Sequence, residues 1–125
     1  MEDYKKIKSF TDLNVWQESH RLVLMIYKET ENFPKHEQFG LAAQMRRAAV
    51  SITSNIAEGF SRRSYKEKIQ FYSVAHGSLT ELENQLIVSR DVGYIKISDF
   101  DKIMEQVLVA HRLLNKFISK TREFL

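Results

Sequence analysis

The sequence predicts an all-α protein, a single domain folded as an antiparallel, up-down-up-down four-helix bundle. Apolar residues recur every three or four positions through four long segments, and no segment alternates apolar and polar residues as a half-buried strand does. The segments are joined by short connections, which favour antiparallel neighbours. A chain of 125 residues has the length of one domain that can bury a substantial core.

The first helix is expected over about residues 13–32. Thr11 or Asp12 is expected to cap it, because a short side-chain oxygen can accept a free backbone N–H of the first turn. Pro34, the single proline, is expected to end it, because the residue before a proline avoids helical geometry. Its predicted core face consists of Leu13, Trp16, His20, Val23, Tyr27 and Thr30.

The second helix is expected over about residues 37–58. Its segment QMRRAAVSITSNIAEG, residues 44–59, is rich in small side chains, so a neighbouring helix can approach closely. Gly59 is expected to end the helix as a left-handed cap. The predicted apolar face consists of Leu41, Met45, Ala48, Ile52 and Ile56.

The third helix is expected over about residues 64–91, where Ser64 and Glu67 have the spacing of a capping box. Gly77 lies in its middle and costs about 1 kcal/mol relative to alanine, which indicates a close helix contact there. Gly93 follows the end of the helix. The predicted core face consists of Ile69, Tyr72, Ala75, Leu79, Leu82 and Leu86.

The fourth helix is expected over about residues 98–122 and is expected to open at Ser98. Its core face consists of Phe100, Ile103, Val107, Ala110, Leu114 and Phe117. Several helices carry a second apolar edge, beyond what one small bundle needs, which favours a homo-oligomer. The alternative is that these are single exposed apolar side chains, which are normal on protein surfaces.

The net charge of +3 is unevenly distributed along the chain. Residues 60–70 hold four bases and one acid, residues 112–123 repeat that ratio, and residues 71–111 hold three bases and six acids. A basic zone attracts phosphates, so it is a candidate nucleic-acid surface as well as a possible solvated face. The candidate contact residues are Arg62, Arg63, Lys66 and Lys68, with the ring of Tyr65 placed to stack on unpaired bases.

Polar side chains on the second and third helices predict a structural network rather than a catalytic site. Arginines and carboxylates near a bundle interior are tolerated when they pair, and such pairs need no catalytic role. The predicted members are Arg46, Arg47, Asn55, Glu58, Ser78 and Glu81, with the arginines pairing with the glutamates.

The sequence lacks the residue patterns of the common metal-binding, thiol and phosphate-binding sites. The chain has no cysteine, no Glu-x-x-His pair, no His-Glu-x-x-His motif and no glycine-rich phosphate loop. We therefore expect no catalytic residues, no metal and no cofactor. The absence of a signal peptide and of a membrane-spanning apolar run predicts a cytoplasmic protein.

The segments FTDLNVWQESHRL, FPKHEQFGLAAQMRRAAVSITSNIAEG and HGSLTELENQL resemble the four helix bundle protein family, also called the 23S rRNA-intervening-sequence protein family. The resemblance covers residues 10–97 strongly and the fourth helix more loosely. It implies an antiparallel bundle that assembles as a homopentamer. A related accessory protein of diversity-generating retroelements forms a basic pentameric barrel that binds nucleic acid and a reverse transcriptase.

Residues and resemblance together predict a non-enzymatic oligomer that binds structured RNA or DNA through a ring of basic patches. The alternative is an oligomeric scaffold that binds a partner protein and has no nucleic-acid role. An enzyme is the least favoured of the three classes.

Overall fold

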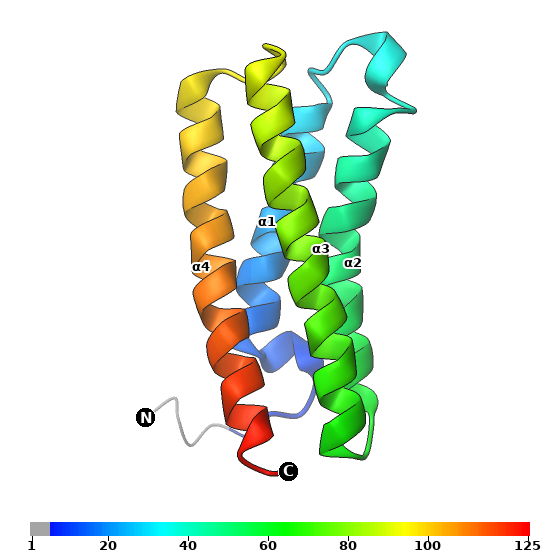
Figure 1. Cartoon of the computed structure of the whole chain (residues 1–125), viewed down its shortest axis with the longest axis vertical. Helices are drawn as coiled ribbons and strands as arrows, with labels where there is room; N and C mark the ends of the chain where they lie inside the picture. Colours follow the sequence, from blue (N-terminus) through cyan, green and yellow to red (C-terminus); the bar gives the residue numbers. More distant parts are fainter. Residues whose placement is uncertain (1–5) are drawn as a thin grey trace.

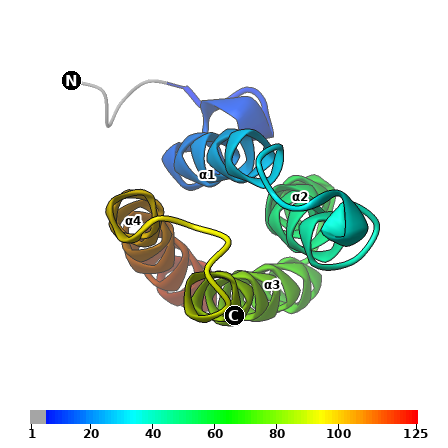
Figure 2. The same ribbon diagram turned by 90° about the horizontal axis from the view of Figure 1, so that it is seen from above.

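The computed structural model, which describes residues 6–125, confirms the predicted four-helix bundle (Figure 1). Its helices are α1 (Asn14–Thr30), α2 (Leu41–Ser61), α3 (Tyr65–Asp91) and α4 (Ile97–Arg122). Two short 3₁₀ helices, η2 (Phe10–Asp12) and η3 (Lys35–Glu37), precede α1 and α2. Seen from above, each helix packs against its two neighbours in the order α1, α2, α3, α4 and back to α1, and the α2–α3 contact is the most extensive (Figure 2).

The core confirms most of the predicted helix faces. Its fully buried side chains include Leu22, Ile26, Met45, Ile52, Ile56, Leu79, Leu82, Leu86, Val107 and Leu114. Tyr27 was expected in the core face of the first helix, but it is 44% exposed. The Arg46 guanidinium lies over its ring, 5.6 Å from the ring centroid. Spacing places a residue near a helix edge without deciding whether a neighbouring helix covers it.

The start of α1 differs from the prediction. Ser9, rather than Thr11 or Asp12, acts as the cap, and it caps η2: its hydroxyl accepts from the Thr11 N–H at 3.1 Å. Asp12 completes this capping box by accepting from the Ser9 N–H at 3.1 Å. Leu13 then precedes α1 without any side-chain cap. At the other end, α1 stops at Thr30, ahead of Pro34 as expected.

The predicted helix starts at Glu37 and Ser98 are also corrected. Residues 35–37 form η3, and Glu37 accepts at Oε1 from the Leu41 N–H, 3.2 Å away, at the real start of α2. α4 begins one residue before Ser98 and has no side-chain cap. The Ser64 cap is confirmed, since its hydroxyl accepts from the Glu67 N–H at 3.1 Å.

The left-handed cap predicted at Gly59 is wrong. Gly59 lies inside α2, which continues to Ser61, and Gly93 after α3 is the glycine with a positive φ, 83°. A Cβ at Gly59 would lie 2.6 Å from the Tyr72 ring and 2.9 Å from the Phe71 Cβ. Gly59 therefore allows α3 to approach α2 so closely that the Tyr72 ring is buried against the α2 backbone. That burial raises the pKa of Tyr72 to about 12.

The close contact predicted at Gly77 is not formed. No atom outside the local helix backbone lies within 4 Å of a Cβ built there. The sequence correctly predicted a close contact between helices at a glycine, but the glycine that forms it is Gly59. Which face of α3 turns towards α2 depends on the packing of all four helices and cannot be decided from a single glycine.

We predict opposite effects of alanine at the two helical glycines. Gly59→Ala should lower the free energy of unfolding by about 1–3 kcal/mol, because Tyr72 and the Phe71 Cβ must move. Gly77→Ala should raise it by up to about 1 kcal/mol, since the site is open and alanine favours the helix. Urea denaturation at one fixed protein concentration measures both. Equal effects at the two positions would contradict the packing described.

Candidate nucleic-acid interface

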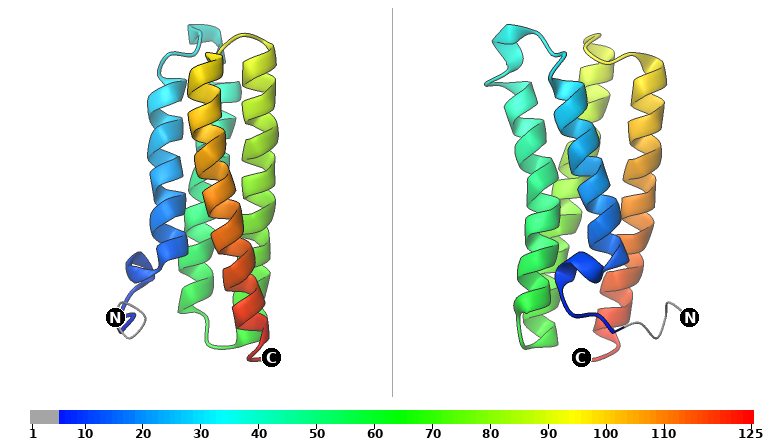
Figure 3. Two further views of the ribbon diagram at one scale, coloured as in Figure 1. Left: turned by 90° about the vertical axis from the view of Figure 1, so that its left-hand side faces the viewer. Right: turned by 180° about the vertical axis from the view of Figure 1, so that it is seen from behind.

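Charge is distributed asymmetrically along the bundle. The α2–α3 connection, the end of α4 and the segment before α1 lie at one end of the molecule (Figures 1 and 3). Residues 54–70 carry four bases and two acids there, and residues 116–125 carry three bases and one acid. At the other end, residues 28–40 and 88–102 together carry five bases and six acids. Two basic zones that are distant in sequence therefore form one basic end.

Arg62, the first predicted contact residue, is already engaged. Its guanidinium donates to the Glu58 carboxylate at 3.2 Å and lies over the Phe71 ring at 4.7 Å. Its Nε is buried and has no partner within the described chain. The side chain is 41% exposed and contributes to the positive field, but it is held by Glu58 and Phe71.

Lys68, also predicted as a contact residue, caps a helix. Its ammonium donates to the Phe60 carbonyl at 2.7 Å and reaches the Gly59 carbonyl at 3.5 Å, near the end of α2. It also lies over the Phe60 ring at 5.4 Å. Burial lowers the pKa of Lys68. The last carbonyls of a helix lack intrahelical donors, and this ammonium supplies one.

Other bases at this end are exposed, and their side chains have no hydrogen-bond or ion-pair partner within residues 6–125. They include Arg63, Lys66, Lys120 and Arg122. The first two were predicted from the sequence. The last two were recognised as basic but were not assigned to the site. The signal was available, because in an up-down-up-down bundle the end of the fourth helix meets the connection between the second and third.

An exposed aromatic pair lies beside these bases. The rings of Tyr65 and Phe124 stack with centroids 4.9 Å apart and planes inclined by 16°. They remain 42% and 65% exposed, respectively. Tyr65 was predicted as a stacking residue, whereas Phe124 was missed because nothing in the sequence places it next to Tyr65. The pair presents a flat apolar surface to solvent in a positive field.

The predicted polar network of the second and third helices is divided into separate groups. Arg46 donates to Thr30 Oγ1 at 2.9 Å and to Gln38 Oε1 at 3.1 Å, so it ties α2 to the end of α1. Within residues 6–125, neither Arg46 nor Arg47 pairs with Glu58 or Glu81. Position 58 lies 11 residues after position 47, roughly 16 Å along one helix, too far for an ion pair.

The remaining members join α2 and α3 through hydroxyl groups. Asn55 donates to the Ser51 carbonyl at 2.8 Å, and the Ser51 hydroxyl lies 2.7 Å from the Ser78 hydroxyl. Glu81 accepts from Gln85 at 3.4 Å. Asn55 also donates to the Ser51 hydroxyl at 3.1 Å, so Asn55 and Ser78 are connected through Ser51, which was not among the predicted members.

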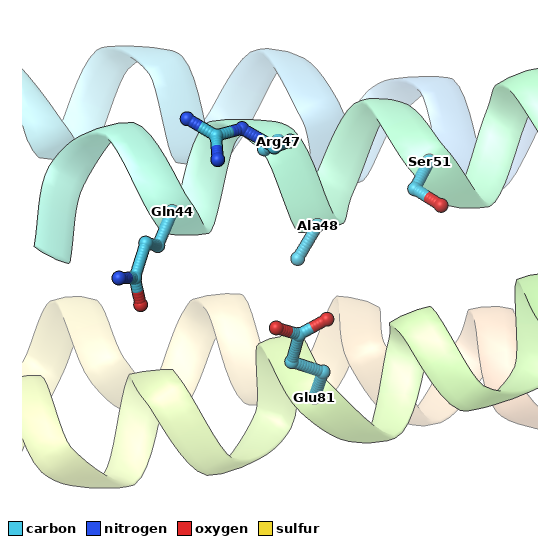
Figure 4. A pocket seen from close by; sticks show the side chains of 5 residues that line it. All are labelled: Gln44, Arg47, Ala48, Ser51 and Glu81. Carbon is cyan, nitrogen blue, oxygen red and sulfur yellow. The ribbon is translucent and has the colours of Figure 1, made fainter.

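A polar groove of about 440 Å³ lies between α2 and α3. Figure 4 shows Gln44, Arg47, Ala48 and Ser51 along α2, and the Glu81 carboxylate directed from α3 towards them. Because the groove holds both a cation and a carboxylate, its charges offset each other and it does not extend the basic end.

Two of the histidines make local contacts within the bundle. His20 stacks on Trp16 at 4.7 Å, and His111 bonds to Glu83 at 3.2 Å. Over residues 6–125 no set of three His, Cys, Asp or Glu side chains is placed to hold a metal ion. None of the helices described has the combined length and apolar character needed to span a bilayer.

Comparison with known families identifies the chain. Residues 11–116 match the family described as 23S rRNA-intervening sequence protein. The chain belongs to this family. A solved structure from Bacteroides thetaiotaomicron, described as a protein of unknown function from the S23 ribosomal protein family, superposes with a TM-score of 0.78. At 22% identity, over 84% of this chain and 95% of that one, it shows a shared fold. Curated proteins give no match.

We predict that Lys68 and Lys66 differ in their effect on stability. Lys68→Ala should lower the free energy of unfolding by about 1 kcal/mol, because carbonyls near the end of α2 lose their donor. Lys66→Ala should change it by less than about 0.5 kcal/mol, because that side chain is exposed and unpaired. Thermal and urea denaturation provide the comparison. A larger effect at Lys66 would refute the assignment of roles.

Proposed function

We propose that this protein binds nucleic acid, structured RNA or DNA, through its basic end and that it has no catalytic activity. One observation carries the proposal: Arg63, Lys66, Lys120 and Arg122 come from two distant segments, yet they lie at one end with their charges unpaired. Arg62, by contrast, pairs with Glu58. The family's association with ribosomal RNA genes agrees with the proposal.

The basic end would act mainly through phosphate neutralisation. Lysine and arginine side chains release counterions from nucleic acid, so affinity falls steeply as salt rises and depends little on base sequence. The Tyr65–Phe124 pair adds a surface on which an unpaired base can stack. RNA with loops or bulges offers phosphates and unstacked bases together. The proposal includes a cytoplasmic location.

Self-association is the second part of the proposal. Phe39, between η3 and α2, is 98% exposed. Beside the start of α2, a groove between α1 and α2 is lined by Tyr27, Ala43 and Val50 together with Arg46 and Arg47. Exposed apolar side chains next to such a groove favour a contact between copies. A closed ring, such as the homopentamer implied by the family resemblance, would repeat the basic end by symmetry.

A scaffold that binds a partner protein is the alternative. The end of α3 exposes Ile87, Val88 and Val92 next to the balanced, slightly acidic end of the bundle. This surface is remote from the basic end, so the two proposals predict different residues. Charge reversal at the basic end would leave such a protein contact unchanged.

We predict that Arg63→Glu/Lys66→Glu weakens nucleic-acid binding about tenfold or more, since two phosphate contacts are lost and two repulsions appear. The measurement is fluorescence anisotropy with a labelled, structured ribosomal-type RNA and a DNA of equal length, at low and physiological salt. These positions are preferable to Arg62, which the fold uses.

The matched control is Lys35→Glu/Lys102→Glu, which makes the same change in net charge at the opposite end. It should bind nearly as tightly as the wild type. No binding at low salt by the folded wild type, or equal losses in both double variants, would overturn the proposal.

We predict that Phe39→Ser reduces self-association. The Phe39 ring is exposed in one copy and would be buried in a contact between copies, and serine removes that apolar area. Sedimentation velocity over a range of protein concentrations should show a smaller species than the wild type gives. Phe39→Leu retains an apolar side chain and should retain most of the assembly. An unchanged oligomer in Phe39→Ser would exclude this residue from the contact.

A further inference from the structure

A second groove lies between α3 and α4, next to the basic end but on the side of the bundle. Its volume is about 230 Å³, and it is lined by Ser73 and His76 from α3 and by Asn115, Ile118 and Arg122 from α4. Ile118 is buried and provides an apolar floor. The other four side chains carry a hydroxyl, an imidazole, an amide and a guanidinium, and each of these groups can donate a hydrogen bond.

These four polar side chains have no hydrogen-bond or ion-pair partner within residues 6–125. His76 does contact the ring of His111, which is not one of the four. The two rings meet edge-on, with centroids 5.2 Å apart. A half-buried histidine and an exposed arginine with unused donors line one groove, an arrangement that the fold itself does not require.

The groove lining also contains no carboxylate. Glu81 lines the α2–α3 groove, and Glu29 and Asp99 line a groove between α1 and α4. Glu83, also on α3, is bonded to His111 of α4 at 3.2 Å. The groove between α3 and α4 therefore offers donors and positive charge without a competing anion.

We propose that this groove is a binding site for a phosphate group. Phosphate oxygens are acceptors that match an arginine fork, an imidazole N–H, an amide and a hydroxyl at the same time. Ser73, Asn115 and Arg122 are exposed and His76 is half-buried, so a phosphate could enter from solvent. The site shares Arg122 with the basic end proposed above but includes neither Arg63 nor Lys66, so variants at those two positions test the two proposals separately.

The phosphate has two possible sources, a small phosphorylated molecule and a nucleic-acid backbone. Lys66 lies seven residues before Ser73, two turns along the same face of α3, and Arg122 lies two residues before Phe124. The groove is thus continuous with the basic end, and a strand bound there could reach it. The chemistry of recognition is the same for both sources.

The test follows the ring resonances of the four histidines by proton NMR at constant pH and ionic strength. The probes are inorganic phosphate, a 5′-nucleoside monophosphate and a short single-stranded oligonucleotide. The resonances of His76 should shift and saturate, with a smaller change at His111, which it contacts. The resonances of His20 and His36 should not move, because those residues lie away from the groove.

Arg122→Gln should weaken the binding seen at His76 about tenfold or more, because the charged donor is lost. Arg112→Gln removes the same charge from the same helix outside the groove and should change the affinity by less than about twofold. His76→Gln, read by isothermal titration calorimetry, should also weaken binding. Unchanged amide spectra show that each variant is folded.

Saturable binding of inorganic phosphate, lost in Arg122→Gln, supports a site for small phosphates. Binding of the oligonucleotide alone, also lost in Arg122→Gln, supports a backbone phosphate as the ligand. No saturable shift at His76 with any probe, or equal shifts at all four histidines, overturns the inference. Arg63→Glu/Lys66→Glu separates the two proposals, since phosphate binding at His76 should survive when nucleic-acid binding at the basic end is lost.

Discussion

The absence of a side chain at Gly59 is the constraint on which one end of the bundle depends. It lets the Tyr72 ring lie against the α2 backbone, and Tyr72 in turn packs on Phe117 of α4 at 4.7 Å between ring centroids. One glycine thereby fixes three helices relative to one another. It also brings the start of α3 close enough for Lys68 to reach carbonyls near the end of α2 and for Phe71 to lie beneath Arg62.

This close approach divides the basic residues into two groups. Lys68 and Arg62 have structural roles. Lys68 donates to a carbonyl near the end of α2, and Arg62 pairs with the Glu58 carboxylate beside an aromatic ring. Arg63 and Lys66 face solvent, where the end of α4 adds further unpaired charge. All of them contribute to the field that would attract a polyanion, but contacts with phosphates fall to the exposed group. The basic cluster looks uniform in sequence, but two of its four residues have structural roles and the other two face solvent.

Helix packing also decides how the polar grooves differ. Between α2 and α3, small residues such as Ala48 and Ser51 leave an open groove whose Arg47 and Glu81 offset each other in charge. Between α3 and α4, the lining has donors and no carboxylate. The first groove is balanced in charge, whereas the second is positive. Anion recognition is accordingly favoured in one groove and disfavoured in the other.

Helix periodicity, turn residues and short connections were sufficient to predict the bundle, its topology and most of its core, because each is a local property of the chain. Capping was less predictable: Ser64 caps as expected, whereas 3₁₀ turns replace the expected cap at Thr11 or Asp12 and the expected helix start at Glu37. Those turns depend on how the chain before each helix packs.

The sequence by itself determined the fold and the existence of basic and polar clusters. Only the tertiary structure decided that Gly59, not Gly77, forms the close contact, that Lys68 is a cap, and that Phe124 and Arg122 lie beside Tyr65 and His76. The reason is physical. These outcomes depend on the rotation of each helix about its axis and on its offset along its neighbours, and the packing of all four helices sets both together.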